Sequence, residues 1–189
     1  MKAFDKVYGH YDAFMKLFNL YKIEEIRTVL NLQGYEILAD IGGGTGCLAA
    51  SLSDHCQKIY VLDESERMLS KVKTNEKIIP VPGDALHMPF EDGSMDIVIL
   101  SDVLHHLEEQ QALIAEIHRI LKRKGKMLIL DFDKRYIKTK LLRFFEYLLF
   151  GKLYFRTSRE VKDLCKDKFV MHTFIDKQYY FMILGEKND

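Results

Sequence analysis

Acidic residues that close apolar runs are the residues of this chain whose types and spacing could bind a ligand. Asp40, Asp63 and Asp84 each stand at the end of such a run. Between Asp40 and a helical pattern that begins at Cys47 lies a turn rich in glycine, with Gly42, Gly43, Gly44 and Gly46. Strand, glycine turn and helix in this order are typical of a nucleotide-like ligand at the carboxyl end of a parallel sheet, because glycine lets the ligand approach the backbone and the helix directs amide groups at it.

The position of Asp40 indicates the chemistry of that ligand. The spacing Gly44-x-Gly46-x-x-Ala49 alone would also fit a dinucleotide fingerprint. A carboxylate two residues before the glycines would repel a pyrophosphate and attract a cation. S-adenosylmethionine carries a sulfonium and an ammonium group and no phosphate, so it fits Asp40 better than NAD(P) does.

Two stretches carry a resemblance to a known family. Asp40-Ile-Gly42-Gly-Gly44-Thr-Gly46 resembles the D-x-G-x-G-x-G loop of class I S-adenosylmethionine-dependent methyltransferases, and residues 83–96 resemble the G-D-A-x-x-[LM]-P-F-x-D-x-S-x-D pattern of their type 11 group. The opening segment is similar to that of quinone C-methyltransferases. The resemblance implies an α/β, Rossmann-like fold with a seven-stranded, mostly parallel sheet, an antiparallel strand in a C-terminal hairpin, and helices on both faces.

Cofactor-binding roles follow from the resemblance for S-adenosylmethionine and its product S-adenosylhomocysteine. Asp40 and the glycine amides would hold the methionine part, and Asp63, with Glu64 beside it, would accept the ribose hydroxyls. Asp84 would accept from the adenine amino group, the amide of Ala85 would face the ring, and Met68 would pack near it. Each acid has a simpler alternative, because a carboxylate at a strand end is often only solvated and Asp84 could be a turn residue.

The end of the strand expected at 95–100 is the predicted reaction site, because reacting groups collect at the carboxyl ends of such strands. Carbonyl groups around Ser101 would line the reacting centre. For His105 and His106 a structural role and a role as general base both stay open, whereas a zinc site lacks further ligands at suitable spacing. Only the resemblance ranks His106 ahead as the catalytic residue, and no metal is expected.

The two terminal segments of the chain are expected to cover the site. Residues 4–32 read as two helices, the second ended by Gly34, and the resemblance makes Tyr11 a candidate lid residue. Residues 139–150, within a basic, aromatic segment at 138–159, are interpreted as a helix that covers the sheet, with a lid over an apolar substrate or a lipid-facing surface as the alternatives. We therefore expect one domain, with a helical lid at 1–34, a cofactor-binding core at 35–133, and a helical cover and closing hairpin at 134–189.

Further elements are expected between these motifs. A helix at 108–122 would end in the basic run before Gly125, and a strand at 126–131 would follow. Ser65 and Ser158 would cap the helices that follow them. Strands at 169–174 and 179–185 would form the hairpin.

Composition excludes several classes of protein. The chain has 189 residues and a formal net charge of zero, which gives no pull toward nucleic acid. Three cysteines without metal-ligand spacing and the absence of a secretory segment predict a cytoplasmic protein, and no apolar run is long enough for stable membrane insertion. We expect a monomer or homodimer that methylates a small molecule, with a non-catalytic S-adenosylmethionine-binding regulator and, less favoured, an NAD(P)-dependent oxidoreductase as alternatives.

Overall fold

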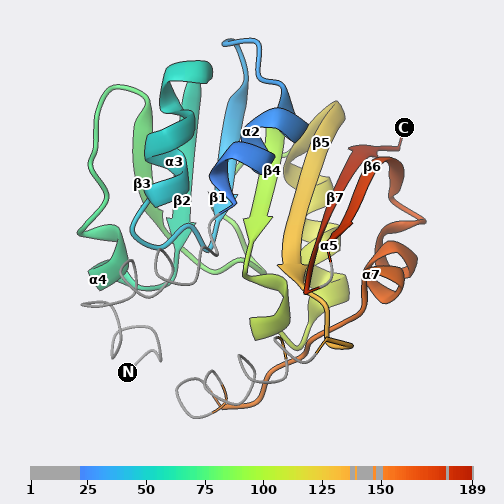
Figure 1. Ribbon diagram of the computed structural model, residues 1–189. Coiled ribbons are helices and arrows are strands. Elements are labelled where there is room, and N and C mark those ends of the chain that lie inside the picture. The colour runs from blue at the N-terminus through green and yellow to red at the C-terminus, as the bar shows by residue number, and fades with distance from the viewer. Residues whose placement is uncertain (1–21, 137–138, 140–146, 148–150, 178, 189) are drawn as a thin grey trace.

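A computed structural model describes residues 22–136, 139, 147, 151–177 and 179–188 (Figure 1). The first predicted helix, with the lid residue Tyr11, lies outside the described residues, as does most of the expected covering helix at 139–150. The description below concerns the remaining chain.

A seven-stranded sheet forms the centre of the described chain, with the order β3-β2-β1-β4-β5-β7-β6. The first five strands in this order run parallel, and β7 pairs antiparallel with both β5 and β6. The predicted fold class is thus confirmed, including the antiparallel hairpin. The strands are β1 (Ile37–Ile41), β2 (Lys58–Asp63), β3 (Ile78–Pro82), β4 (Met95–Ser101), β5 (Leu121–Phe132), β6 (Phe169–Lys177) and β7 (Tyr180–Lys187).

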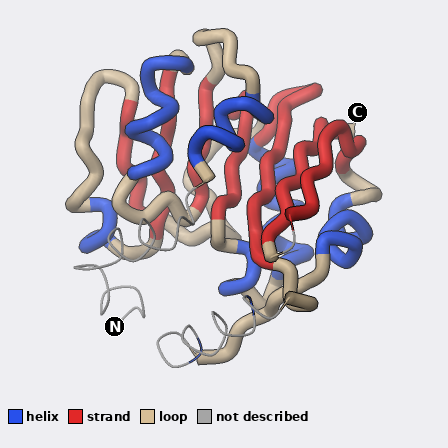
Figure 2. The backbone as a smooth tube through the Cα atoms, viewed as in Figure 1, coloured by secondary structure: helices blue, strands red, loops and turns tan. Residues whose placement is uncertain are grey.

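Helices cover both faces of this sheet (Figure 2). On one face α2 (Ile23–Leu30) and α3 (Cys47–Leu52) pack their apolar side chains against the strands. On the other face α5 (Gln110–Ile120) and α7 (Ser158–Cys165) do the same. The alternation of side chains along each strand supplies both cores, since Leu38 belongs to the first and Ala39 to the second.

Three short helices complete the described elements: η2 (Ser53–His55), α4 (Glu66–Leu69) and η3 (Leu104–His106). Ser65 caps α4 as predicted, because its hydroxyl accepts a hydrogen bond from the Met68 amide at 3.2 Å. Within the described ranges, every helix is too short or too polar to cross a bilayer.

Several predicted boundaries were wrong. Helix α2 ends at Asn31, which adopts the left-handed conformation with φ 46°, three residues before Gly34. The basic run at 122–125 lies inside β5 and is no helix end, because β5 begins at Leu121 and pairs with β4 from there. Thr157 caps α7 in a capping box with Glu160, so Ser158 is the first helical residue and not the cap.

The strand order places the site. β1 has β2 on one side and β4 on the other, so the chain reverses its direction of winding next to β1. In open parallel sheets the crevice at such a switch point, beyond the carboxyl ends of the strands, is where ligands bind. Asp63 ends β2 and Ser101 ends β4, which brings the predicted residues to this edge.

Candidate active site

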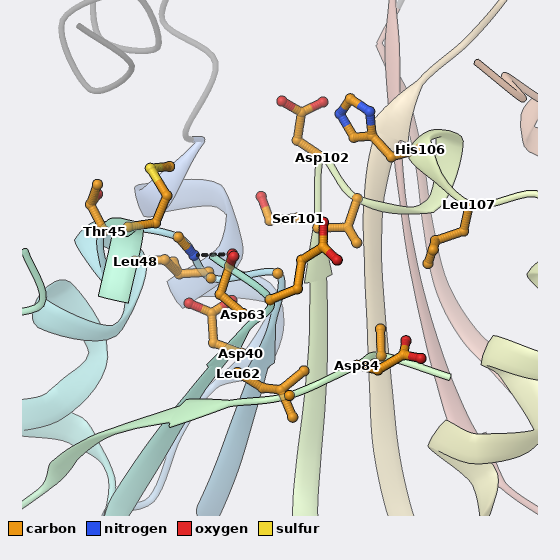
Figure 3. A pocket seen from close by; sticks show the side chains of 18 of the residues that line it. Asp40, Thr45, Leu48, Leu62, Asp63, Asp84, Ser101, Asp102, His106 and Leu107 are labelled. Atoms are coloured by element: carbon orange, nitrogen blue, oxygen red, sulfur yellow. Dashed lines mark hydrogen bonds between the residues drawn. The ribbon is translucent and has the colours of Figure 1, made fainter. Parts of the chain in front are cut away.

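A pocket of about 270 Å³ opens at the carboxyl ends of the parallel strands (Figure 3). Most of the predicted site residues line it, although they come from separate strands and loops. Gly46 is the exception among the described residues, because it lies at the start of α3 and only shapes the turn. The predicted residues in the wall are Asp40, Gly42, Gly43, Gly44, Asp63, Glu64, Met68, Asp84, Ala85, Ser101 and His106.

The glycine turn is packed so tightly that side chains are excluded. Gly42 has φ 67°, and a Cβ atom there would lie 2.6 Å from Cγ2 of Val103. A Cβ atom on Gly43 would lie 2.7 Å from Oδ2 of Asp40. Glycine is thus required at 42 for both conformation and space, and at 43 for space alone.

The amides of this turn, which the resemblance assigns to the ligand, make hydrogen bonds within the fold. Gly42 and Gly43 both donate to the carbonyl of Leu62, at 2.7 and 3.2 Å, and Gly46 donates to Gly43. Gly44 donates to Oδ2 of Asp63 at 3.0 Å. Three of these amides fasten the turn to the end of β2 and the fourth closes the turn on itself, so the turn offers a ligand a close approach and a shape.

Asp40 is a buried carboxylate directed into this turn. It is 2% exposed, and its Oδ2 atom has no hydrogen-bond partner among the described residues. Burial, and then the charge of Asp63, raise the pKa of Asp40 to about 7. An acid in this state lacks the positive partner that would stabilise its ionised form, so the site suits a cationic group.

Asp63 ties the turn to the helix that follows β2. Its Oδ2 accepts the amide of Gly44, and its Oδ1 accepts the amide of Ser65 at 2.8 Å. A carboxylate oxygen has further lone pairs, so these bonds orient the group and still leave capacity for hydroxyl protons. Asp63 is therefore fixed in place at the pocket, and Glu64 beside it is exposed.

Asp84 lies both in a turn and at the pocket. Its Oδ1 accepts the amide of Leu86 at 2.9 Å, and its Oδ2 lies 3.3 Å from Nδ1 of His87, so it is a turn residue. The same side chain also lines the pocket and is exposed. Ala85 lies next to it in the wall, whereas Met68 lies across the pocket with its terminal methyl group near Gly44.

The other end of the pocket is formed by the turn after β4. In Figure 3, Asp102 and His106 lie together there, apart from Asp40 and Asp63, and Ser101 lies between the two pairs. Burial, and then the neighbouring His105, hold the pKa of His106 well below its ordinary 6.5. His106 is thus neutral at pH 7 and able to accept a proton.

His105 has a structural position. It is 1% exposed, its Nδ1 lies 2.7 Å from Oδ1 of Asp131, and its ring stacks on Phe155 at 4.1 Å. Asp102 and Asp131 lie close enough to His105 for the three to hold a metal, a grouping that the sequence spacing did not indicate. The hydrogen bond to Asp131 already accounts for the geometry of the ring.

Sequence reasoning missed several wall residues, above all Lys152 and Leu153. Both belong to the segment Gly151–Thr157, which we call the wall segment, between the cover region and α7. No motif marks it, since its contribution depends on contacts with η3 about fifty residues earlier in the chain. Val103 and Leu107 were also missed, although their position on either side of the histidine pair is a usable signal.

The sheet order and the pocket at its switch point are those expected for the fold of class I S-adenosylmethionine-dependent methyltransferases. A profile of the methyltransferase domain matches residues 39–129, which include both motifs. The matched profile is that of the type 11 group, in agreement with the resemblance described above.

Similar proteins agree with this assignment. A demethylmenaquinone methyltransferase from Clavibacter sepedonicus is 30% identical over 139 residues, which cover 69% of this chain and 56% of the relative. The matched part is thus little more than half of that relative's length.

Solved structures share the fold at lower identity. A complex between the Haloferax volcanii Trm112 methyltransferase activator and a methyltransferase contains a chain that aligns with a TM-score of 0.87 at 15% identity, over 100% of this chain and 99% of that one. A methyltransferase from Aquifex aeolicus aligns with a TM-score of 0.74 at 18% identity, over 89% and 91% of the two chains. At these identities the comparison concerns the fold alone.

Proposed function

We propose that this chain transfers the methyl group of S-adenosylmethionine to a small-molecule acceptor. One observation carries the proposal: the Oδ2 atom of Asp40, buried and without a partner among the described residues, faces a turn whose glycines admit a close ligand. A cationic ligand would stabilise the ionised carboxylate there. The sulfonium and ammonium groups of S-adenosylmethionine have the required charge.

The other acids fit the rest of such a cofactor. Asp63 is held by two amides with lone pairs left for ribose hydroxyls, and Asp84 is exposed at the pocket where it can accept from an amino group. Neither acid suits a pyrophosphate, which argues against the NAD(P)-dependent alternative.

When bound, the cofactor supplies a methyl group on a sulfonium, which is a good leaving group. The chain's own task is then to align the acceptor and to exclude water. Val103, Leu107 and Leu153 provide apolar walls at the acceptor end. His106, neutral at pH 7, would take a proton from an acceptor that must lose one during attack.

The acceptor end favours a small and partly apolar molecule. Lys152 is the single cation among the described lining residues, whereas five of those residues are acids. An acceptor with an acidic group, such as a hydroxyl on an aromatic ring, would suit Lys152 together with His106. Because a relative is named as a demethylmenaquinone methyltransferase, reduced naphthoquinones come first in the panel of test acceptors.

Calorimetric titration with S-adenosylhomocysteine, and with NADH in parallel, tests the cofactor. We expect micromolar binding of S-adenosylhomocysteine and none of NADH. Binding of NADH without binding of S-adenosylhomocysteine would reject the proposed methyltransferase function. Release of S-adenosylhomocysteine is then measured with reduced naphthoquinones, phenols, amines and thiols, and binding without turnover on any of them would favour a regulatory protein.

A further inference from the structure

The acceptor end of the pocket is made by two segments far apart in the sequence. Helix η3 lies between the lining residues Val103 and Leu107 and carries His106, whereas the wall segment carries Lys152 and Leu153. The two must be held in register for one acceptor to touch both. The contacts that hold them are therefore part of the site.

One buried side chain joins the two segments directly. Gln110, at the start of α5, is 1% exposed, and its Nε2 donates to the carbonyl of Leu104 in η3 at 2.9 Å. The same Nε2 donates to the carbonyl of Tyr154 in the wall segment, also at 2.9 Å. Its Oε1 accepts from Nε of Arg156, two residues further along the wall segment.

The donors and acceptors around Gln110 leave little choice of residue. Two carbonyl groups can only accept, and a guanidinium group can only donate. The side chain between them must therefore supply two N–H donors on one side and an acceptor on the other, which a primary amide does. Glutamate has nearly the same shape but, when ionised, would place an acceptor against both carbonyls.

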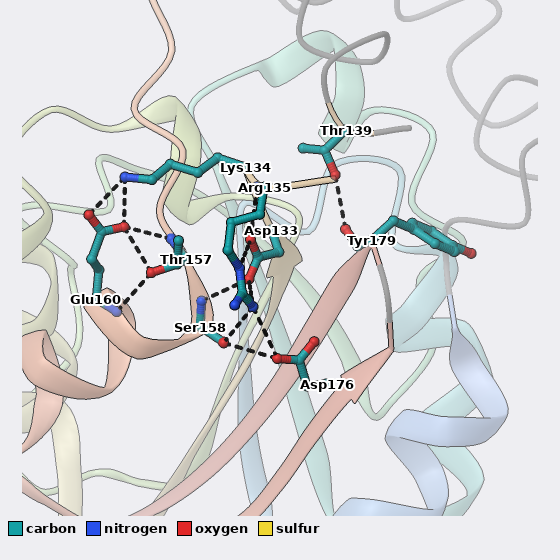
Figure 4. Close-up of polar contacts among 9 residues, drawn as sticks. All are labelled: Asp133, Lys134, Arg135, Thr139, Thr157, Ser158, Glu160, Asp176 and Tyr179. Atoms are coloured by element: carbon teal, nitrogen blue, oxygen red, sulfur yellow. Dashed lines mark hydrogen bonds and ion pairs between the residues drawn. The ribbon is translucent and has the colours of Figure 1, made fainter. Parts of the chain in front are cut away.

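Other contacts hold the wall segment but do not replace this bridge. The backbone amide of Tyr154 donates to the carbonyl of His105 at 2.7 Å, while the carbonyl of the same Tyr154 accepts from Gln110. At the far end of the segment, Asp133 accepts the Ser158 amide at 3.1 Å and Thr157 caps α7 (Figure 4). The bond from Tyr154 to His105 thus also joins the wall segment to η3, whereas the contacts of Ser158 and Thr157 attach its far end. Gln110 adds a side-chain bridge that bonds both η3 and two residues of the wall segment.

We propose that Gln110 is a positioning residue of the acceptor end. Its side-chain amide holds η3, which carries His106, in register with the wall segment, which carries Lys152. This inference rests on the proposed function, because the pocket has an acceptor end only if the chain transfers a methyl group to an acceptor. The contacts lie at the acceptor end, so cofactor binding at Asp40 and Asp63 does not depend on them.

The test compares Gln110→Glu with Gln111→Glu, because Gln111 is the exposed neighbour and the change in charge is the same. Gln110→Met and Gln111→Met repeat the comparison without a charge. For each variant, S-adenosylhomocysteine affinity is measured by calorimetry and the titration of the His106 imidazole by NMR. Neither measurement requires a known acceptor.

We expect both Gln110 variants to bind S-adenosylhomocysteine within about twofold of the unaltered protein, since buried contacts far from a ligand change its affinity little. The pKa of His106 should rise by about one unit toward its ordinary value, because a loosened turn admits water and reduces desolvation. Both Gln111 variants should leave it unchanged.

Two results would overturn the proposal. The first is a pKa of His106 in Gln110→Met equal to that in Gln111→Met. The second is loss of S-adenosylhomocysteine binding in both Gln110 variants, because the bridge would then support the whole site. Failure of the unaltered protein to bind S-adenosylhomocysteine would instead reject the proposed function, while the His106 titration would still decide the role of Gln110.

Discussion

The two ends of the pocket are built in different ways. At the cofactor end, Asp40, Asp63 and Asp84 lie at or just after the ends of successive strands, and backbone amides within a few residues or one strand away hold Asp63 and Asp84. At the acceptor end, η3 and the wall segment meet through Gln110 and through the bond from Tyr154 to His105. Local sequence motifs predict the cofactor end, whereas the acceptor end depends on contacts between segments that are far apart in the sequence.

The chemistry of the two ends differs in the same way. Carboxylates dominate the cofactor end, which suits a cationic ligand. The acceptor end combines apolar side chains with a neutral histidine, one ammonium group and the buried carboxylate of Asp102, and this suits a partly apolar molecule that loses a proton. If the comparison is right, variants at one end should spare the other.

The largest effect is expected for His106→Ala. Loss of a general base typically lowers turnover by about 100-fold or more. S-adenosylhomocysteine affinity should stay within about twofold, because the change lies at the acceptor end. Since the pKa of His106 is lowered well below 6.5, the unaltered protein should show no acidic limb near pH 6.5 in its rate profile. Exposed His172→Ala is the control, and unchanged turnover in His106→Ala would limit this residue to packing.

Asp63→Ala should abolish most cofactor binding. The change removes the acceptor of the Gly44 and Ser65 amides together with the ribose site, and hydrogen bonds to a charged group contribute about 1.5–3 kcal/mol each. We expect S-adenosylhomocysteine affinity to fall about 100-fold or more by calorimetry, with the His106 titration unchanged. Exposed Asp54→Ala serves as the control, and a shift in His106 would show that the two ends are coupled.

Asp40 should make cofactor affinity depend on pH. Its pKa is raised to about 7 in the ligand-free protein, so below pH 7 the acid must lose a proton before it can face a cation. Affinity for S-adenosylhomocysteine should therefore fall up to about tenfold per pH unit below pH 7 and level off above pH 8. Asp40→Asn should remove this dependence, and a dependence that persists in this variant would contradict the assignment.

The same residue should cost the ligand-free protein stability. An acid whose pKa is raised on folding opposes folding increasingly as pH rises from about 4 to 7, and fully above pH 7. Asp40→Asn should then raise the melting temperature more at pH 8 than at pH 5, while Asp54→Asn should not. Equal shifts at both pH values would assign the gain to packing.

The smallest effect is expected for Asp84→Asn. The amide oxygen can still accept from Leu86, so the turn persists, but a donor replaces one acceptor at the pocket. One lost hydrogen bond at an exposed position corresponds to an affinity about three- to tenfold lower. Asp84→Ala, which also loses the turn contact, should bind more weakly still. Equal affinity in Asp84→Asn and the unaltered protein would leave Asp84 as a turn residue only.

The sequence predicted the cofactor end because its signals are local. An acid at the end of an apolar run and glycines before a helix determine each other's positions within about ten residues, and the sheet order follows from the alternation of strands and helices. The start of β5 was missed because helix and strand adjoin at Leu121 without a breaker. The α7 cap was misplaced by one residue, since Thr157 and Ser158 are both good caps and Glu160 decides between them.

At the acceptor end only Ser101 and His106 were predicted. Lys152, Leu153 and Gln110 carry no motif, and their roles arise from contacts between segments about fifty residues apart. The partners of the glycine-turn amides were not predicted for a similar reason, because the carbonyl of Leu62 that accepts from two of them comes from the neighbouring strand. Tertiary partners decide which groups are left for a ligand.

The position of β7 has a consequence for how the chain acquires its structure during synthesis. β6 precedes β7 in the chain, yet it pairs only with β7, which lies between it and β5. β6 therefore leaves the ribosome before β7, the strand with which it pairs, has been synthesised. We expect residues 169–177 to be the stretch most exposed to chaperones and to wrong pairing, until β7 docks against β5 and completes the sheet.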